Sequence, residues 1–155
     1  MVPLEDHNKG TVIFLDTNVL IYASDVTSRH HKWAREMIVT EVSSDGAMIN
    51  PVVLAELCVG ESAPDKAADT IRAWGVEIVD LPGACAERCA AAYSAYSKVR
   101  KQRAAEPAPR IPLPDFFIGA HASILKIPLC TADARRYQTY FPELELRTPK
   151  RTKQN

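Results

Sequence analysis

Two aspartates follow predicted strands, so their carboxylates could act together. Asp16 comes immediately after residues 11–15, a short apolar and β-branched run that predicts a buried strand. Asp133 comes shortly after residues 128–131, a second run of the same kind. In an open parallel sheet, ligands bind beyond the carboxyl ends of the strands. We therefore expect Asp16 and Asp133 at one edge of the sheet, where they could bind a cation.

Glu56 is a third candidate, because it lies in the apolar stripe of a predicted helix. Val52 and Val53 precede it by four and three residues, and Val59 follows it by three. A carboxylate in such a stripe needs a cation or a proton, because burying a lone charge is costly. The alternative is a side chain that extends to solvent or pairs with an arginine such as Arg72. Both interpretations remain open for Glu56 alone.

Asp115 is the fourth candidate and opens a predicted helix whose body begins with residues 116–120. An aspartate at this position is ordinarily a cap or first-turn residue, stabilised by the free backbone N–H groups of the helix. The same explanation applies to Asp133. For either residue taken alone, it is the favoured interpretation.

The four acids together predict a metal site if the fold brings them into contact. Two carboxylates about 5 Å apart repel by about 3 kcal/mol at an effective dielectric constant of about 20. Such a cluster therefore requires a multivalent cation or shifted pKa values. An all-oxygen ligand set favours Mg²⁺ or Mn²⁺ over zinc or copper. The predicted cluster consists of Asp16, Glu56, Asp115 and Asp133.

The elements that must position these residues alternate between strand and helix. Strands are predicted at residues 11–15, 47–49, 76–79 and 128–131, with an edge strand at 144–146, and helices at 19–23, 29–42, 51–59, 64–74, 84–100, 115–126 and from 133. This alternation predicts an α/β fold with one parallel central sheet and helices on both faces. Asn18 and Ser28 are predicted helix caps, and Asn50-Pro51 is a strong helix start.

The chain is expected to form one domain, residues 1–146, followed by a basic, loose tail at 147–155. Its 155 residues suffice for a single core. Four prolines exclude a helix between residues 106 and 114, so this segment is predicted to be an extended loop. Basic and acidic residues number 19 each, so net charge indicates no partner.

The composition also predicts the cellular location of the protein and the state of its cysteines. No apolar run approaches the roughly 20 residues that span a bilayer, and residues 1–10 lack the apolar region of a signal peptide. We expect a cytoplasmic protein with no membrane partner. In that reducing compartment the four cysteines are expected to be small apolar residues without disulfides. They are Cys58, Cys85, Cys89 and Cys130.

Four segments, in order and at matching spacing, resemble the acidic motifs of PIN-domain nucleases. They are residues 14–21, 51–57, 113–120 and 130–133, and the resemblance extends from about residue 11 to residue 146. It is strongest to the VapC-type toxins of type II toxin–antitoxin pairs. Phe116-Phe117 and the long proline-rich segment depart from the usual pattern, which affects the choice of substrate more than catalysis.

The resemblance implies a PIN-like three-layer fold and a metal-dependent endoribonuclease that leaves a 5′-phosphate and a 3′-hydroxyl. One or two Mg²⁺ or Mn²⁺ ions are implied. Asp16 and Asp115 would be direct ligands, Glu56 a ligand directly or through water, and Asp133 would complete the cluster. Three polar residues would orient the carboxylates or waters: Thr17, Asn18 and Thr131.

The implied partners are an RNA substrate, a cognate antitoxin and a second copy of the chain. The helices that contain Trp33 and Trp74 are candidate dimer surfaces. Basic residues before the third motif are candidates for RNA binding, although a solvated helix face explains them nearly as well. These are Lys98, Arg100, Lys101, Arg103 and Arg110, and the tail adds Arg147, Lys150, Arg151 and Lys153. His30, His31 and His121 are not assigned to the site.

Three other functions match parts of this pattern. A haloacid-dehalogenase-like phosphatase would need a second acid two residues after Asp16, where this chain has Asn18. A PIN-like module that binds RNA or protein without cutting is disfavoured, because all four acids are present. A PIN nuclease of RNA processing remains an alternative to a toxin.

Overall fold

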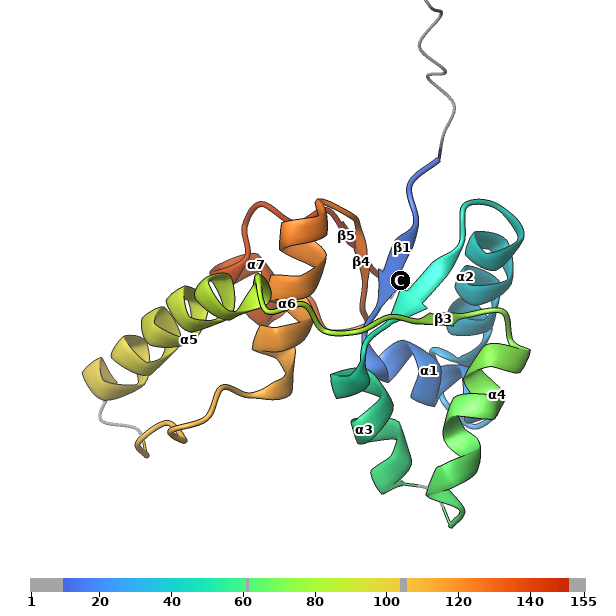
Figure 1. Ribbon diagram of the computed structural model, residues 1–155, viewed down its shortest axis with the longest axis horizontal. Helices are drawn as coiled ribbons and strands as arrows, with labels where there is room; N and C mark the ends of the chain where they lie inside the picture. Colours follow the sequence, from blue (N-terminus) through green and yellow to red (C-terminus); the bar gives the residue numbers. More distant parts are fainter. Residues whose placement is uncertain (1–9, 61, 104–105, 151–155) are drawn as a thin grey trace, which may run out of the picture.

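A five-stranded, all-parallel sheet forms the centre of the molecule (Figure 1). The computed structural model describes residues 10–60, 62–103 and 106–150. The strand order is β3-β2-β1-β4-β5. The strands are β1 (Ile13–Leu15), β2 (Ala47–Ile49), β3 (Glu77–Ile78), β4 (Leu129–Cys130) and β5 (Leu146–Arg147). Each predicted strand is present, although most are shorter than expected.

Helices flank the sheet, which confirms the predicted α/β class. They are α1 (Thr17–Ser24), α2 (His31–Ser43), α3 (Pro51–Val59), α4 (Ala67–Ala73), α5 (Cys85–Gln102), α6 (Pro114–Leu125) and α7 (Arg135–Tyr140), with a 3₁₀ turn, η1 (Pro64–Lys66), before α4. In Figure 1, α5, α6 and α7 gather to the left of β1, and α1 to α4 lie below it and to its right. None of the helices in the described ranges is both long and apolar enough to cross a membrane.

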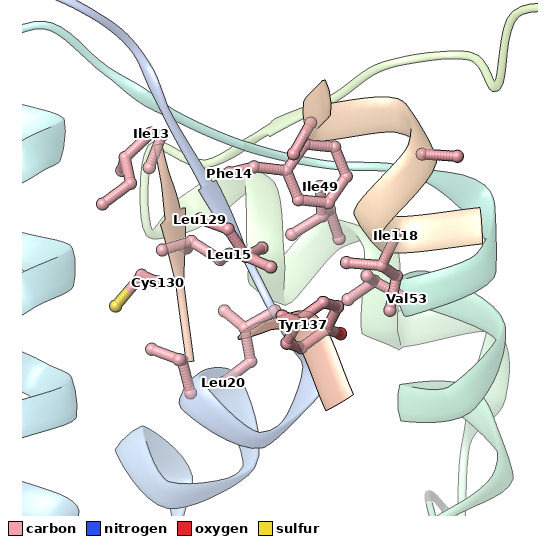
Figure 2. Packing of buried hydrophobic residues seen from close by; sticks show 14 of the residues in the cluster. Ile13, Phe14, Leu15, Leu20, Ile49, Val53, Ile118, Leu129, Cys130 and Tyr137 are labelled. Carbon is pink, nitrogen blue, oxygen red and sulfur yellow. The ribbon is translucent and has the colours of Figure 1, made fainter. Parts of the chain in front are cut away.

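The central strand is buried on both faces, because helices cover the two sides of a parallel sheet. Ile13, Phe14 and Leu15 are fully buried, as are Leu129 and Cys130 on the neighbouring strand. Figure 2 shows these side chains packed with Leu20, Ile49, Val53 and Ile118 from the surrounding elements. The strands consequently read as continuous apolar runs, and β1 delivers Asp16 directly from the core to the sheet edge.

Two of the three predicted helix starts are corrected. Asn50 caps α3 as expected, with its Oδ1 accepting hydrogen bonds from the N–H groups of Val52 at 3.0 Å and Val53 at 3.1 Å. The cap of α1, however, is Asp16, because its carboxylate lies at the end of β1 and accepts from Thr17 N at 2.8 Å. Asn18 is instead one residue inside the helix.

The second correction concerns α2, which begins at His31 without a side-chain cap. Ser28 is too far upstream to cap it, and its hydroxyl accepts a hydrogen bond from His30 N within the preceding turn.

The predicted tail begins later than expected. Arg147 is the last residue of β5, and its Nη1 donates to Glu41 at 2.8 Å. Lys150 is the last residue that the structure describes, and Arg151 and Lys153 lie outside the described residues. The four cysteines are free, as predicted, and three of them are buried.

Candidate metal centre

Asp16 is held at the carboxyl end of β1 by donors from the start of α1 and from the residue that follows β4. Its side chain is 5% exposed. Oδ1 accepts from Thr17 N, and Oδ2 accepts from Thr131 Oγ1 at 2.8 Å and from Asn18 Nδ2 at 3.4 Å. The three residues expected to orient carboxylates are therefore all in contact with this one. Few orientations of the Asp16 carboxylate remain available.

Asn18 also ties the loop after β4 to this corner. Its Oδ1 accepts from Ala132 N at 3.1 Å, and its Nδ2 lies 3.3 Å from Thr131 Oγ1. Thr131 Oγ1 in turn accepts from Asp133 N at 3.1 Å. The first and fourth motifs thus form one hydrogen-bonded unit at the edge of the sheet.

Glu56 joins the same unit through Thr17. The carboxylate is half-buried on α3, and its Oε1 accepts from Thr17 Oγ1 at 2.7 Å. Thr17 therefore contacts Asp16 with its backbone N–H and Glu56 with its hydroxyl. The alternative partner for Glu56, Arg72, lies 3.9 Å from Asp69 instead. The interpretation of Glu56 as a residue paired with Arg72 is thereby excluded.

Asp115 contributes from α6, where Pro114 is the first helical residue and Leu113 the cap. It is half-buried and does not cap the helix. Its Oδ2 accepts from Arg136 Nη1 at 2.9 Å. The Arg136 guanidinium is itself held over the ring of Tyr96, with its Cζ 5.3 Å from the ring centroid. Such cation–π packing fixes the arginine beside the acid.

The pKa shifts of Asp16 and Tyr137 show which of the four acids lie near one another. Burial, followed by the negative charge of Asp115, raises the pKa of Asp16 from 3.8 to about 6, against the lowering effect of its hydrogen bonds. Burial also raises the pKa of Tyr137 well above its ordinary value, and the charges of Asp16, Asp115 and Glu56 add to this effect. These three carboxylates therefore all lie within electrostatic range of one hydroxyl.

Asp133 lies at the rim of this group. Its side chain is 61% exposed, and its Oδ1 accepts from the backbone N and Nε of Arg135, each at 3.4 Å. Its charge is not among those that shift the pKa of Asp16 or of Tyr137. As the side chains stand, the structure brings three of the predicted acids together and leaves the fourth at the edge.

The chemistry of the donors fits a hard divalent cation. Among residues 10–60, 62–103 and 106–150, no three Asp, Glu, His or Cys side chains are placed so that they could hold a metal ion. Yet Asp16 is buried, carries an elevated pKa and faces a second carboxylate, so its ionised form lacks a compensating charge. Arg136 supplies part of that charge to Asp115. The oxygen donors are those that Mg²⁺ and Mn²⁺ prefer.

Neither Arg136 nor Tyr137 is among the residues predicted from the sequence. The signal that could have indicated them is their spacing, because they follow Asp133 by three and four residues, one turn of a helix. His121, which is not assigned to the site, is buried, and its Nδ1 lies 3.2 Å from Asn50 Nδ2.

The predicted RNA-binding residues lie towards the end of α5 and in the proline-rich loop. Arg100 is half-buried and donates to the carbonyl of Glu106 from both Nε and Nη2, at 2.9 and 2.7 Å. It therefore fastens the loop to the helix. The other four side chains are exposed: Lys98, Lys101, Arg103 and Arg110.

A hollow of about 960 Å³ lies at the opposite edge of the sheet, near the amino ends of β1, β4 and β5. Four of its charged side chains form two ion pairs, in which Arg147 lies 2.8 Å from Glu41 and Arg88 lies 2.8 Å from Glu143. None of the four candidate acids lines it.

Comparison with known proteins identifies the fold and the family. The profile of the PIN domain family matches residues 13–142. One chain of the DNA-bound VapBC structure from Salmonella typhimurium is similar over 90% of this chain and 98% of its own length, with 19% identity and a TM-score of 0.63.

Two further structures have the same fold. A chain of VapBC-1 from nontypeable Haemophilus influenzae is 19% identical, with 88% of this chain and 97% of that chain covered and a TM-score of 0.60. VapC20 from Mycobacterium tuberculosis, described as a sarcin-ricin loop cleaving toxin, is 17% identical, with 86% and 98% covered and a TM-score of 0.58. No curated protein matches the sequence at a significant level.

The family match spans all four acidic positions and most of the chain. It also excludes the haloacid-dehalogenase-like phosphatase considered from the sequence. This chain belongs to the PIN domain family.

Proposed function

We propose that this protein is a metal-dependent endoribonuclease that hydrolyses RNA phosphodiester bonds as the toxin of a toxin–antitoxin pair. The observation that carries the proposal is the buried Asp16 carboxylate facing Asp115, with Glu56 joined to it through Thr17. Membership of the PIN family and the descriptions of the similar structures support it. The direct test is RNA cleavage by the purified chain in Mg²⁺ or Mn²⁺, with loss of cleavage in EDTA.

In this proposal, Asp16 and Asp115 hold one or two Mg²⁺ or Mn²⁺ ions, and Glu56 assists directly or through water. When bound, such an ion lowers the pKa of a coordinated water and neutralises charge on the scissile phosphate. Thr17, Asn18 and Thr131 keep the Asp16 carboxylate in one orientation, so little reorganisation is needed when the substrate arrives. Asp133 acts from the rim of the site.

Arg136 has a definite place in this scheme, because a cation that binds Asp115 competes with it. The guanidinium remains held on the faces of Tyr96 and Phe116 after the exchange. It would then present its N–H donors beside the metal, where an RNA phosphate must lie. Arginine is well suited to that role, because its fork of donors matches phosphate oxygens.

A cognate antitoxin and a second copy of the chain are the proposed protein partners. One similar structure is described as a toxin–antitoxin complex from Klebsiella pneumoniae, at 22% identity and a TM-score of 0.55. Trp33 and Trp74, on the candidate dimer helices, are half-buried against the core. Helices α1, α2 and α3 each expose an apolar side chain that a protein partner could cover: Ile21, Val39 and Val59.

Charge reversal at the exposed end of α5 is expected to weaken RNA binding. The double variant Lys101→Glu/Arg103→Glu would remove two phosphate contacts, so the slope of log affinity against log salt should fall by about 1.4 for single-stranded RNA. Binding is measured in EDTA over a range of salt concentrations. Lys32→Glu/Arg35→Glu makes the same charge change on exposed residues of α2 and serves as the control. Equal slopes for the two variants would remove α5 from the RNA-binding surface.

A further inference from the structure

Tyr137 is an exception to the rule that buried polar groups are paired. Its side chain is 1% exposed, and its hydroxyl is the one buried side-chain polar atom in the described ranges without a hydrogen-bond partner. Figure 2 shows the ring among apolar side chains, with its oxygen directed away from Leu20. Leaving a buried hydroxyl unpaired is costly, and a phenylalanine would fill the same space without that cost. Packing alone therefore does not explain why Tyr137 carries a hydroxyl at this position.

The surroundings of this hydroxyl are acidic. After burial, the largest effects on it come from the negative charges of Asp16 and Asp115, and Glu56 adds a smaller one. A hydroxyl in that environment keeps its proton and serves as a hydrogen-bond donor to a carboxylate. Asp16 has the largest effect of the three and is the acid to which Tyr137 can donate most readily.

Helix α7 thus directs two consecutive donors at the acids. Arg136 pairs with Asp115, and Tyr137 brings its hydroxyl to the side of Asp16. Thr17 contacts Asp16 and Glu56 from α1, so the acids receive donors from both α1 and α7. A hydrogen bond from Tyr137 to the Asp16 carboxylate would supply the partner that this hydroxyl lacks.

We propose that Tyr137 is a positioning residue of the metal centre, whose hydroxyl donates a hydrogen bond to the Asp16 carboxylate and holds it in the cation-binding arrangement. This inference rests on the proposed function, because it assumes that Asp16 binds the cation. Tyr137 itself is not a ligand and takes no part in bond cleavage. Its loss weakens metal binding through the orientation of Asp16, as is usual for residues that support a ligand.

The test compares Tyr137→Phe with Tyr140→Phe, a tyrosine on the same helix whose ring packs against Tyr96 and Phe116. Mn²⁺ affinity is measured by calorimetry, and thermal unfolding is measured in EDTA and in excess Mn²⁺. Tyr137→Phe is expected to weaken Mn²⁺ binding about tenfold, with an unfolding temperature in EDTA that is unchanged or higher. Tyr140→Phe is expected to bind Mn²⁺ as the parent does.

Two outcomes would overturn the inference in distinguishable ways. If the parent and Tyr137→Phe bind Mn²⁺ equally, Tyr137 has no positioning role, and the proposed nuclease is unaffected. If the parent itself binds no Mn²⁺, the metal centre fails and the inference fails with it. A purely structural tyrosine would lower the unfolding temperature equally in EDTA and in Mn²⁺, leaving the stabilisation by Mn²⁺ unchanged.

Discussion

Asp16→Asn and Asp115→Asn are each expected to lower the single-turnover rate of RNA cleavage by about a thousandfold, which corresponds to about 4 kcal/mol. Each variant removes a carboxylate whose charge acts on Tyr137 and that would hold the cation in the proposed function. Asp133→Asn is expected to lower the rate by only about tenfold, because its exposed side chain lies at the rim of the site. The measurement is the cleavage rate of one labelled RNA with excess protein at saturating Mn²⁺.

Asn preserves the size of the side chain and most of its hydrogen bonds, so all three variants should remain folded, which circular dichroism will verify. Equal losses for the three variants would place Asp133 within the metal centre. Intact cleavage by Asp16→Asn would remove the proposed role of the most deeply buried of the four acids.

Without metal, Asp16→Asn is expected to be more stable than the parent above about pH 7, by up to about 3 kcal/mol. The pKa of Asp16 is raised to about 6 in the folded protein, from 3.8. The folded state therefore holds this proton more tightly than the unfolded state. The stabilisation by the proton is complete below about pH 3.8 and is lost as the pH rises through about 6. Asn stays neutral throughout and avoids that loss.

The measurement is urea unfolding of both proteins in EDTA between about pH 4 and pH 8. Other groups change stability with pH in both proteins. Burial lowers the pKa of His121, which removes stability as the pH falls, and Arg88 holds the pKa of Glu143 at about 2. The difference between the two proteins cancels these contributions. A difference that does not vary with pH would show that Asp16 ionises without cost, and the case for a missing cation would weaken.

Local chemistry explains which elements could be predicted from the sequence. Asn50-Pro51 determines the start of α3, because both the cap and the fixed proline dihedral act within a few residues. The parallel sheet follows from the alternation of strands and helices. The start of α1 differs from the prediction, because Asp16 and Asn18 are both good helix caps. Which of them caps the helix depends on their contacts with Thr131 and Ala132, which are far away in the sequence.

The sequence predicts only part of the candidate site, because some of its residues are placed by local structure and others by tertiary packing. The sequence places Asp16 after a strand, Asp115 at a helix start and Glu56 in an apolar helix stripe, but it does not show that the three meet in space. The roles of Arg136 and Tyr137 depend on how α7 packs against α6 and β1, which no local pattern encodes. The exposure of Asp133 likewise depends on tertiary structure, since its motif gives no indication of which way the carboxylate turns.

The central claim is tested most directly by incubating the purified protein with a mixed pool of tRNA and rRNA in Mg²⁺, Mn²⁺ or EDTA, beside Asp16→Asn. The account predicts discrete fragments with 5′-phosphates in either metal, and none in EDTA or with the variant. RNA that is bound but left intact in every condition would contradict the account and favour a PIN module that binds without cutting.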